Sequence, residues 1–216
     1  MTSDIGGALQ AALLRLMRAI AEGEDSAVSA LLAASPALAT ARVVGGATRQ
    51  GAKAFYLDAI GHYLYADETA LHVAAAGYRA GSARTLIQMG ANVRARNRLG
   101  AEPLHYAVIG MPGSCAWDPA AQVATIACLI GAGADPNAID KQAVTPLHRA
   151  VRTRCAAAVQ ALLEHGADAR CKNKNGSTPI DLASRTTGRG GSGSPEAKAQ
   201  QREIVCLFQE HGALRK

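Results

Sequence analysis

Aromatic residues are scarce in this sequence. One tryptophan, five tyrosines and two phenylalanines make up 4 % of its 216 residues, whereas alanine is abundant. β-Sandwiches rely on β-branched and aromatic strand residues, so the composition disfavours them and favours thin helices that pack closely. Apolar residues make up 49 % of the chain, an ordinary fraction for a globular protein and enough for a sizeable core.

Long apolar runs and paired cysteines are also missing. No run of 18 uncharged apolar residues occurs, so we expect no transmembrane helix. The stretch 27–41 could be mistaken for a signal peptide, but Glu22, Glu24 and Asp25 precede it where a basic region should lie. The five cysteines are odd in number and form no CxxC pair, which argues against a disulfide framework or a zinc knuckle. Free thiols are typical of reducing compartments, so we expect a cytoplasmic protein.

The charge of the chain is modest and unevenly placed. The formal net charge is +6; residues 1–66 carry five acids and five bases, so the whole excess lies in residues 67–216. A modest basic excess indicates an anionic partner.

Two phrases recur along the chain. The first begins at Thr69, Glu102, Thr145 and Thr178, in steps of 33, 43 and 33 residues, and reads TALHVA, EPLHYA, TPLHRA and TPIDLA. The second contains Gly90, Gly133, Gly166 and Gly212, and reads LIQMGAN, LIGAGAD, LLEHGAD and FQEHGAL. Self-similarity at such a period predicts a repeat architecture.

The residue types of each unit predict a pair of helices. A threonine followed by proline begins the first helix, because the hydroxyl caps it and proline suits its first position. The second helix carries apolar residues at helical spacing, such as Val159, Leu162 and Leu163, and ends at a glycine such as Gly166. One such pair cannot bury its apolar face alone, so we expect the pairs to stack as a solenoid.

The two phrases at period 33 resemble those of ankyrin repeats. The resemblance covers residues 67–216 and extends more weakly to two amphipathic helices at 9–45. It implies an all-α ankyrin-repeat solenoid of about five helix pairs with hairpin-like fingers, in which the histidines of the first phrase (His72, His105 and His148) are structural. It also implies a non-catalytic protein without cofactor or metal, which we expect to be a monomer of bacterial origin.

The repeat pattern divides the chain within one expected domain. We assign 9–45 to a cap repeat, 46–66 to an extended finger, 67–99, 100–142 and 143–175 to repeats, and 176–216 to the C-terminal repeat. In the finger, we expect a short helix at 51–60 and a strand at 61–66 that places Tyr63 and Tyr65 on one face. Loops inserted between paired helices are expected at 110–120 and 186–199, on one edge and about 20 Å apart, from the spacing of packed helices.

The resemblance also points to the residues that bind a partner. Ankyrin-repeat proteins usually use finger tips and exposed first-helix positions, and here many of these positions are basic or aromatic. The candidates are Tyr63, Tyr65, Arg96, Arg98, Lys141, Arg152, Lys172, Lys174 and Arg185. Trp117, in an inserted loop, is a further candidate, although its ring would also be expected to fold back onto the helices.

Two functions remain open from the sequence. The first is a protein-interaction scaffold that binds a partner, for example an acidic one, through its concave groove and finger tips. The alternative is binding of nucleic acid or another polyanion, in which bases track phosphates and Tyr63 or Tyr65 stacks on a base. Catalysis is not expected: residues 188–193 match GxGxxG, but no strand precedes them as a dinucleotide site requires.

Overall fold

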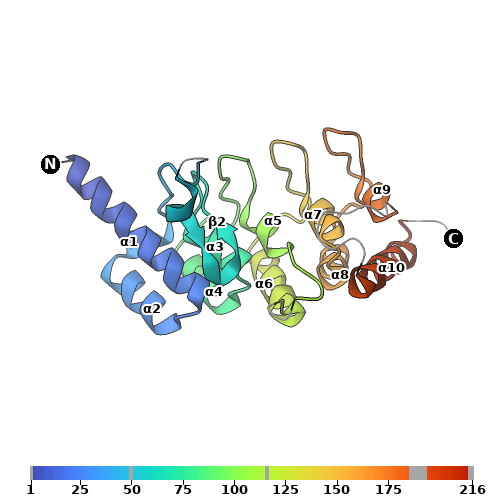
Figure 1. Ribbon diagram of the computed structural model, residues 1–216, viewed down its shortest axis with the longest axis horizontal. Helices are drawn as coiled ribbons and strands as arrows, with labels where there is room; N and C mark the ends of the chain where they lie inside the picture. Colours follow the sequence, from blue (N-terminus) through green and yellow to red (C-terminus); the bar gives the residue numbers. More distant parts are fainter. Residues whose placement is uncertain (1, 49–50, 115–116, 185–193, 214–216) are drawn as a thin grey trace. The chain divides into compact units, whose positions relative to one another are not determined.

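The computed structural model describes residues 2–48, 51–114, 117–184 and 194–213, and the side chains from Gly6 onward. The chain forms two compact units, residues 1–103 and 104–216. Both are built from the helix pairs that the repeat predicted, five in all within the described residues (Figure 1).

The first unit contains two helix pairs. They are α1 (Thr2–Glu22) with α2 (Asp25–Ala34), and α3 (Ala70–Ala76) with α4 (Ala80–Gln88). Helix α1 packs against both α2 and α3 (Figure 1). Apolar side chains one helical turn apart on α1 are fully buried in this interface; they are Leu13, Leu16, Met17 and Ile20. A 3₁₀ turn, Pro36–Ala39, follows α2.

The second unit contains the other three pairs. They are α5 (Pro103–Ala107, which begins at the last residue of the first unit) with α6 (Pro119–Gly131), α7 (Pro146–Arg152) with α8 (Ala156–Glu164), and α9 (Pro179–Ala183) with α10 (Pro195–Glu210). Helix α8 packs between α6 and α10. The core side chains of this unit include Leu104, Ile126, Leu129, Leu147, Leu162 and Phe208.

The helices begin as the repeated phrase predicts. Thr145 caps α7: its hydroxyl accepts a hydrogen bond from His148 N at 3.3 Å, and Pro146 occupies the first turn. Thr178 caps α9 in the same way, although Asp181 replaces the histidine and accepts a hydrogen bond from Thr178 N at 2.8 Å. Local capping chemistry therefore sets these boundaries.

The extended finger of the first unit differs from the expectation of a helix at 51–60. Two 3₁₀ turns, Ala52–Phe55 and Asp58–Ile60, flank strand β1 (Tyr56–Leu57), which pairs antiparallel with β2 (His62–Tyr63). The predicted helix is wrong because tyrosines on facing strands pack together. The rings of Tyr56 and Tyr63 lie 4.5 Å apart between centroids. The predicted strand at 61–66 is shorter than expected and ends at Tyr63.

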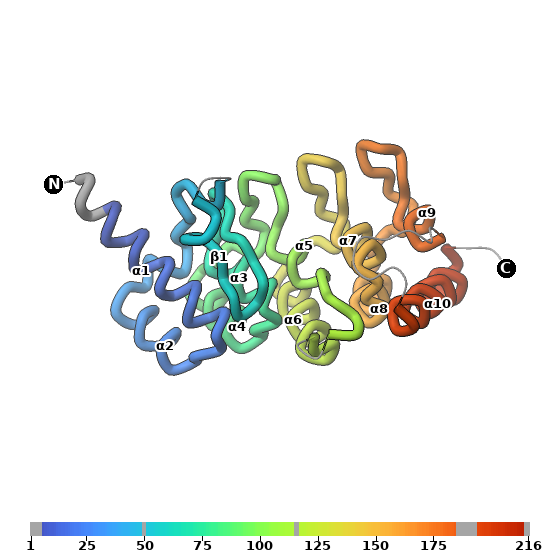
Figure 2. Tube along the Cα trace, viewed as in Figure 1, coloured from blue at the N-terminus to red at the C-terminus, as the bar shows by residue number. Residues whose placement is uncertain are grey.

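The inserted loops are also shorter and closer than expected. Helices α6 and α10 begin at Pro119 and Pro195, inside the stretches 110–120 and 186–199 that were expected to be loops. In their described parts the two insertions approach more closely than the expected 20 Å, since a Cβ atom built on Gly113 would lie 3.8 Å from Glu196 Cβ. The first loop therefore reaches the N-terminal end of α10 within the second unit (Figure 2).

Candidate interaction surface

The recurring histidines tie each repeat to the next turn. In the first unit, His72 Nδ1 accepts a hydrogen bond from Thr69 N at 3.1 Å, so the ring proton lies on Nε2, which donates to Ala101 O at 3.2 Å. In the second unit, His105 and His148 make the same contact with Val144 O and Ser177 O, each at 3.0 Å. Burial lowers the pKa of His72 to about 4, so the ring is neutral at pH 7. These histidines have the structural role that was predicted for them.

The second finger of the first unit, residues 94–99, is held in place by buried polar groups. Asn97 Oδ1 accepts hydrogen bonds from Leu99 N and Ala101 N, and its Nδ2 donates to Glu68 Oε1 at 3.0 Å. His62 Nε2 lies 3.0 Å from the other oxygen of Glu68, which links the extended finger to the same carboxylate. Burial alone would raise the pKa of Glu68, but His62, His72 and Asn97 outweigh it and lower that pKa.

The arginines of this finger are engaged within the first unit. Arg98 places its guanidinium carbon 4.9 Å from the ring centroid of Tyr65, and its backbone N donates to Ala66 O at 3.0 Å. Arg94 Nε and Arg96 Nε lie 3.8 and 3.6 Å from the carboxylate oxygens of the buried Glu102. About half of each of the latter two side chains is exposed (53 and 55 %), so both guanidinium groups are shared between Glu102 and solvent.

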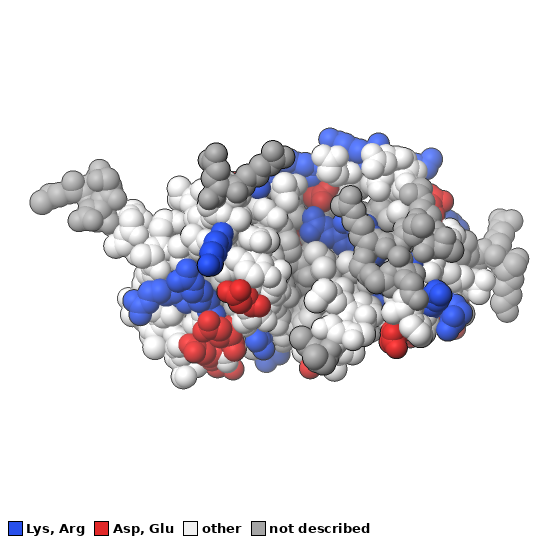
Figure 3. All heavy atoms as spheres, in the orientation of Figure 1, with Lys and Arg blue, Asp and Glu red and all other residues white. Residues whose placement is uncertain are grey.

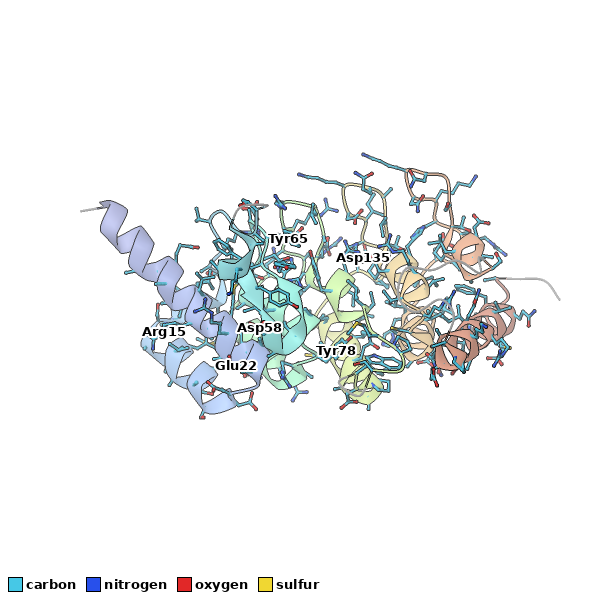
Figure 4. All side chains as sticks on the ribbon, viewed as in Figure 1. Arg15, Glu22, Asp58, Tyr65, Tyr78 and Asp135 are labelled. Atoms are coloured by element: carbon cyan, nitrogen blue, oxygen red, sulfur yellow. The ribbon has the colours of Figure 1, made fainter. Side chains whose placement is uncertain are left out.

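The two candidate tyrosines contact different neighbours. Tyr63 is 42 % exposed and packs on Tyr56, whereas Tyr65, labelled in Figure 4, packs beneath Arg98 and edge-on to His62. Leu64 between them is buried. Both rings therefore belong to the extended finger, but Tyr65 alone joins it to an arginine.

The second unit has two fingers, with tips at 139–142 and 171–175. Hydrogen bonds to backbone N–H groups fix the conformation of each. Asp140 Oδ1 accepts hydrogen bonds from Gln142 N and Val144 N, and Asn173 Oδ1 accepts equivalent bonds from Asn175 N and Ser177 N. Such side-chain to backbone bonds define a tight turn. Lys174 N also donates to Gln142 O at 3.0 Å, so the two finger tips lie side by side.

The described candidate bases of the second unit are exposed, and three of them lie on these tips. Lys141, Lys172 and Lys174 all extend from them into solvent, and Arg152 is exposed at the end of α7. Figure 3 shows basic atoms along the upper edge of this unit, where the two fingers lie in Figure 1. None of the three ammonium groups lies within ion-pair distance of a carboxylate in the described part of the chain.

The comparison with known families agrees with this geometry. A family model described as "Ankyrin repeat" matches residues 67–98, and one described as "Ankyrin repeats (many copies)" matches residues 129–183. The chain contains ankyrin repeats. No curated protein sequence matches it at a significant level. Ankyrin repeats are in general protein–protein interaction modules, and proteins built from them are typically non-enzymatic scaffolds.

Two further candidates for partner binding are Trp117 and Arg185. Trp117 is half-buried: its Nε1 donates to Gln122 Oε1 at 3.1 Å, and its ring covers Gly110, where an added Cβ would come within 2.6 Å of Nε1. The ring therefore folds back onto its own repeat. Arg185 lies outside the described residues, as does the glycine-rich stretch 188–193.

Charged side chains that were not among the candidates from the sequence hold the ankyrin fingers. Arg149 is buried: its Nη2 donates to Asp140 Oδ2 at 3.0 Å, and its guanidinium carbon lies 5.2 Å from the Tyr106 ring centroid. Glu102 stands where the repeated phrase otherwise has threonine, and this departure was a visible signal of a charged contact. Arg42 gave no such signal; its Nη1 donates to Asp67 O and to Arg96 O.

Two findings concern clusters of metal-ligating side chains and long apolar helices in the described ranges. There, no three histidine, cysteine or acidic side chains gather closely enough to hold a metal ion. The helices in the same ranges are all too short or too polar to cross a bilayer.

Proposed function

We propose that the chain is a non-catalytic interaction module that binds an acidic segment of a protein partner through its ankyrin fingers and the adjoining first-helix positions. The contact residues in this proposal are Tyr63, Tyr65, Arg96, Arg98, Lys141, Arg152, Lys172 and Lys174. Trp117 is left out because its indole is used within the fold. Among the described residues, Cys128, Cys155, Cys171 and Cys206 are free thiols, which supports action in a reducing compartment such as the cytoplasm.

The observation that carries the proposal is the fixed position of exposed charge. Asx turns and backbone bonds between neighbouring segments hold the tips, so their side chains are presented with little loss of backbone freedom when a partner binds. Charged groups arranged in this way steer association and fix register, while aromatic side chains supply affinity. Tyr65 beneath Arg98 offers both kinds of group at one point.

A capture experiment with matched variants tests the proposal. The tagged chain is used to capture partners from lysate of its source cells, with and without nuclease, at low and moderate salt. We expect one protein to survive nuclease treatment, and to be lost when Arg98, Lys141, Lys172 and Lys174 are all changed to glutamine. Changing Arg15, Arg18, Arg84 and Lys198 to glutamine removes the same charge from exposed helix positions and should leave capture intact.

The alternative function gives a different result in the same experiment. A polyanion binder would recover nucleic acid and its associated proteins, and nuclease would remove all of them. Its affinity would fall linearly with salt on logarithmic axes, with a slope that reports the number of phosphate contacts. That outcome would replace the protein-interaction proposal.

A further inference from the structure

The two finger tips of the second unit form a surface of their own, which we call the lysine platform. It consists of residues 139–142 and 171–175. The hydrogen bond from Lys174 N to Gln142 O joins the two tips, and backbones joined in this way run about 5 Å apart. Lys141 on one tip and Lys172 and Lys174 on the other therefore lie within reach of a single bound segment.

The aspartate within the platform and the one just before it already accept hydrogen bonds from groups other than the lysines. Asp140 accepts hydrogen bonds from two backbone N–H groups and from Arg149. Asp168 accepts from Arg170 N at 2.8 Å and from Cys171 Sγ at 3.3 Å. Neither neutralises a platform lysine, so the three positive charges repel one another until an external anion arrives.

The first unit differs in this respect. Arg94 and Arg96 share the carboxylate of Glu102, and Arg98 is packed on Tyr65. Its finger therefore carries positive charge that is partly balanced, whereas the charge of the platform is not balanced by any described residue.

An apolar side chain lies beside the lysines. Ile139 is 48 % exposed, directly before the turn that begins at Asp140. Covering an exposed aliphatic side chain is favourable by roughly 25 cal/mol for each Å² removed from water. A partner that matches both features has acidic side chains on either side of an apolar one.

We infer that the lysine platform binds a peptide segment in which carboxylates flank an apolar residue, with the carboxylates on Lys141, Lys172 and Lys174 and the apolar side chain on Ile139. This inference rests on the proposed function and assigns its electrostatic part to the second unit. Single-stranded nucleic acid fits the platform less well, because base stacking needs aromatic rings. Residues 139–142 and 171–175 contain none.

A defined peptide tests the inference on the full chain. The probe is a short fluorescein-labelled peptide in which glutamate pairs flank single leucines; a second peptide has glutamine for every glutamate, and an oligothymidylate serves as the nucleic-acid probe. Binding is measured by fluorescence anisotropy at low and moderate salt. Amide chemical shifts of the ¹⁵N-labelled chain locate the site.

The matched variants are Lys141→Gln/Lys172→Gln/Lys174→Gln and Arg15→Gln/Arg18→Gln/Lys198→Gln, which lose the same charge. Exposed ion pairs contribute up to about fivefold in affinity each, so we expect the first variant to bind the acidic peptide about tenfold more weakly. The second variant should bind as the unchanged chain does. Shifts should concentrate at 139–142 and 171–175, and Ile139→Ser should weaken binding without changing its salt dependence.

Three results would overturn the inference. Shifts centred on 94–99, with equal binding by both variants, would move the site to the first unit and leave the proposed function intact. Failure of the acidic peptide to bind, while a protein is still captured from lysate, would remove the acidic ligand but not the interaction module. Tighter binding of oligothymidylate than of peptide would count against both.

Discussion

Arg149 Nη2 lies 3.0 Å from Asp140 Oδ2, and the two side chains are only 10 and 8 % exposed. This pair joins the start of one finger to the helix that follows it, since Asp140 also accepts the backbone bonds of the turn. Arg149 Nη1 reaches further, to His105 O at 3.5 Å. The arginine thus fixes the base of the finger on which the exposed Lys141 is carried.

Loss of this arginine should destabilise the protein. Removing one partner of a buried ion pair costs about 3–5 kcal/mol; because Asp140 keeps its backbone donors, we expect Arg149→Met to cost about 2–3 kcal/mol. Chemical denaturation measures the change, and Lys141→Met, on the exposed tip, should stay within about 0.5 kcal/mol of the unchanged chain. Adding Asp140→Asn to Arg149→Met should recover part of the loss; a purely additive further loss would show that the pair is not coupled.

Stability should depend on pH through His72. Its pKa is lowered to about 4 by burial, against 6.5 in the unfolded chain. Below pH 6.5 the unfolded state binds a proton that the folded state refuses, so stability is full above that pH and is lost as the pH falls towards 4. The difference of about 2.5 pH units corresponds to roughly 3 kcal/mol.

Urea unfolding between pH 7 and pH 4.5 measures this loss. His72→Gln should reduce the slope of the unfolding free energy against pH. Proton NMR provides a separate check, because the ring signals of His72 should not titrate until the pH approaches 4. A midpoint near 6.5 for those signals would contradict the buried, neutral ring. The pKa values of Glu68 and Asp140 are lowered from ordinary values of 4.5 and 3.8, so most of their contribution is lost below the pH range of this measurement.

The repeat chemistry was predictable because it is local. A threonine, a proline and a histidine within four residues specify a helix start and its contact with the next turn, and Thr145, Pro146 and His148 act in this way. The same phrase could not separate the roles of Arg149 and Arg152. One is buried against Asp140 and the other is exposed, and this depends on how the neighbouring repeats pack.

The insertions were harder to predict. Their positions followed from the repeat spacing, but the strand pair at Tyr56 and Tyr63 depends on a contact between rings seven residues apart. The approach of Gly113 to Glu196 depends on the path of a loop across its own unit. Neither contact has a short-range pattern. Glu102 is different, since its place in a threonine position was visible and only its arginine partners were not.

The packing of Trp117 predicts the effect of a single methyl group. A Cβ atom at Gly110 would lie 2.6 Å from both Trp117 Nε1 and Cys155 Sγ, so Gly110→Ala should overpack this site and cost about 1–3 kcal/mol. Because Trp117 is the only tryptophan, its fluorescence spectrum reports the same displacement. Gly81→Ala is the matched control: nothing lies within 4 Å of its Cβ position in α4, and alanine there should stabilise by up to about 1 kcal/mol. Equal stability of the two variants would mean that Trp117 does not cover Gly110.

The contact between Arg98 and Tyr65 should be measurable as a coupling energy. A guanidinium 4.9 Å from a ring centroid contributes about 0.5–1 kcal/mol at a partly exposed site. The destabilisations caused by Arg98→Met and by Tyr65→Leu should therefore sum to about 0.5–1 kcal/mol more than the destabilisation caused by the double variant. Chemical denaturation of all four proteins gives the coupling. A further variant separates structure from binding: Arg98→Lys keeps the charge but loses the flat stacking surface, so it should lower the coupling while largely preserving capture of an acidic partner. If Arg98→Lys abolished capture while Arg98→Met retained it, charge at this finger could not be the basis of binding.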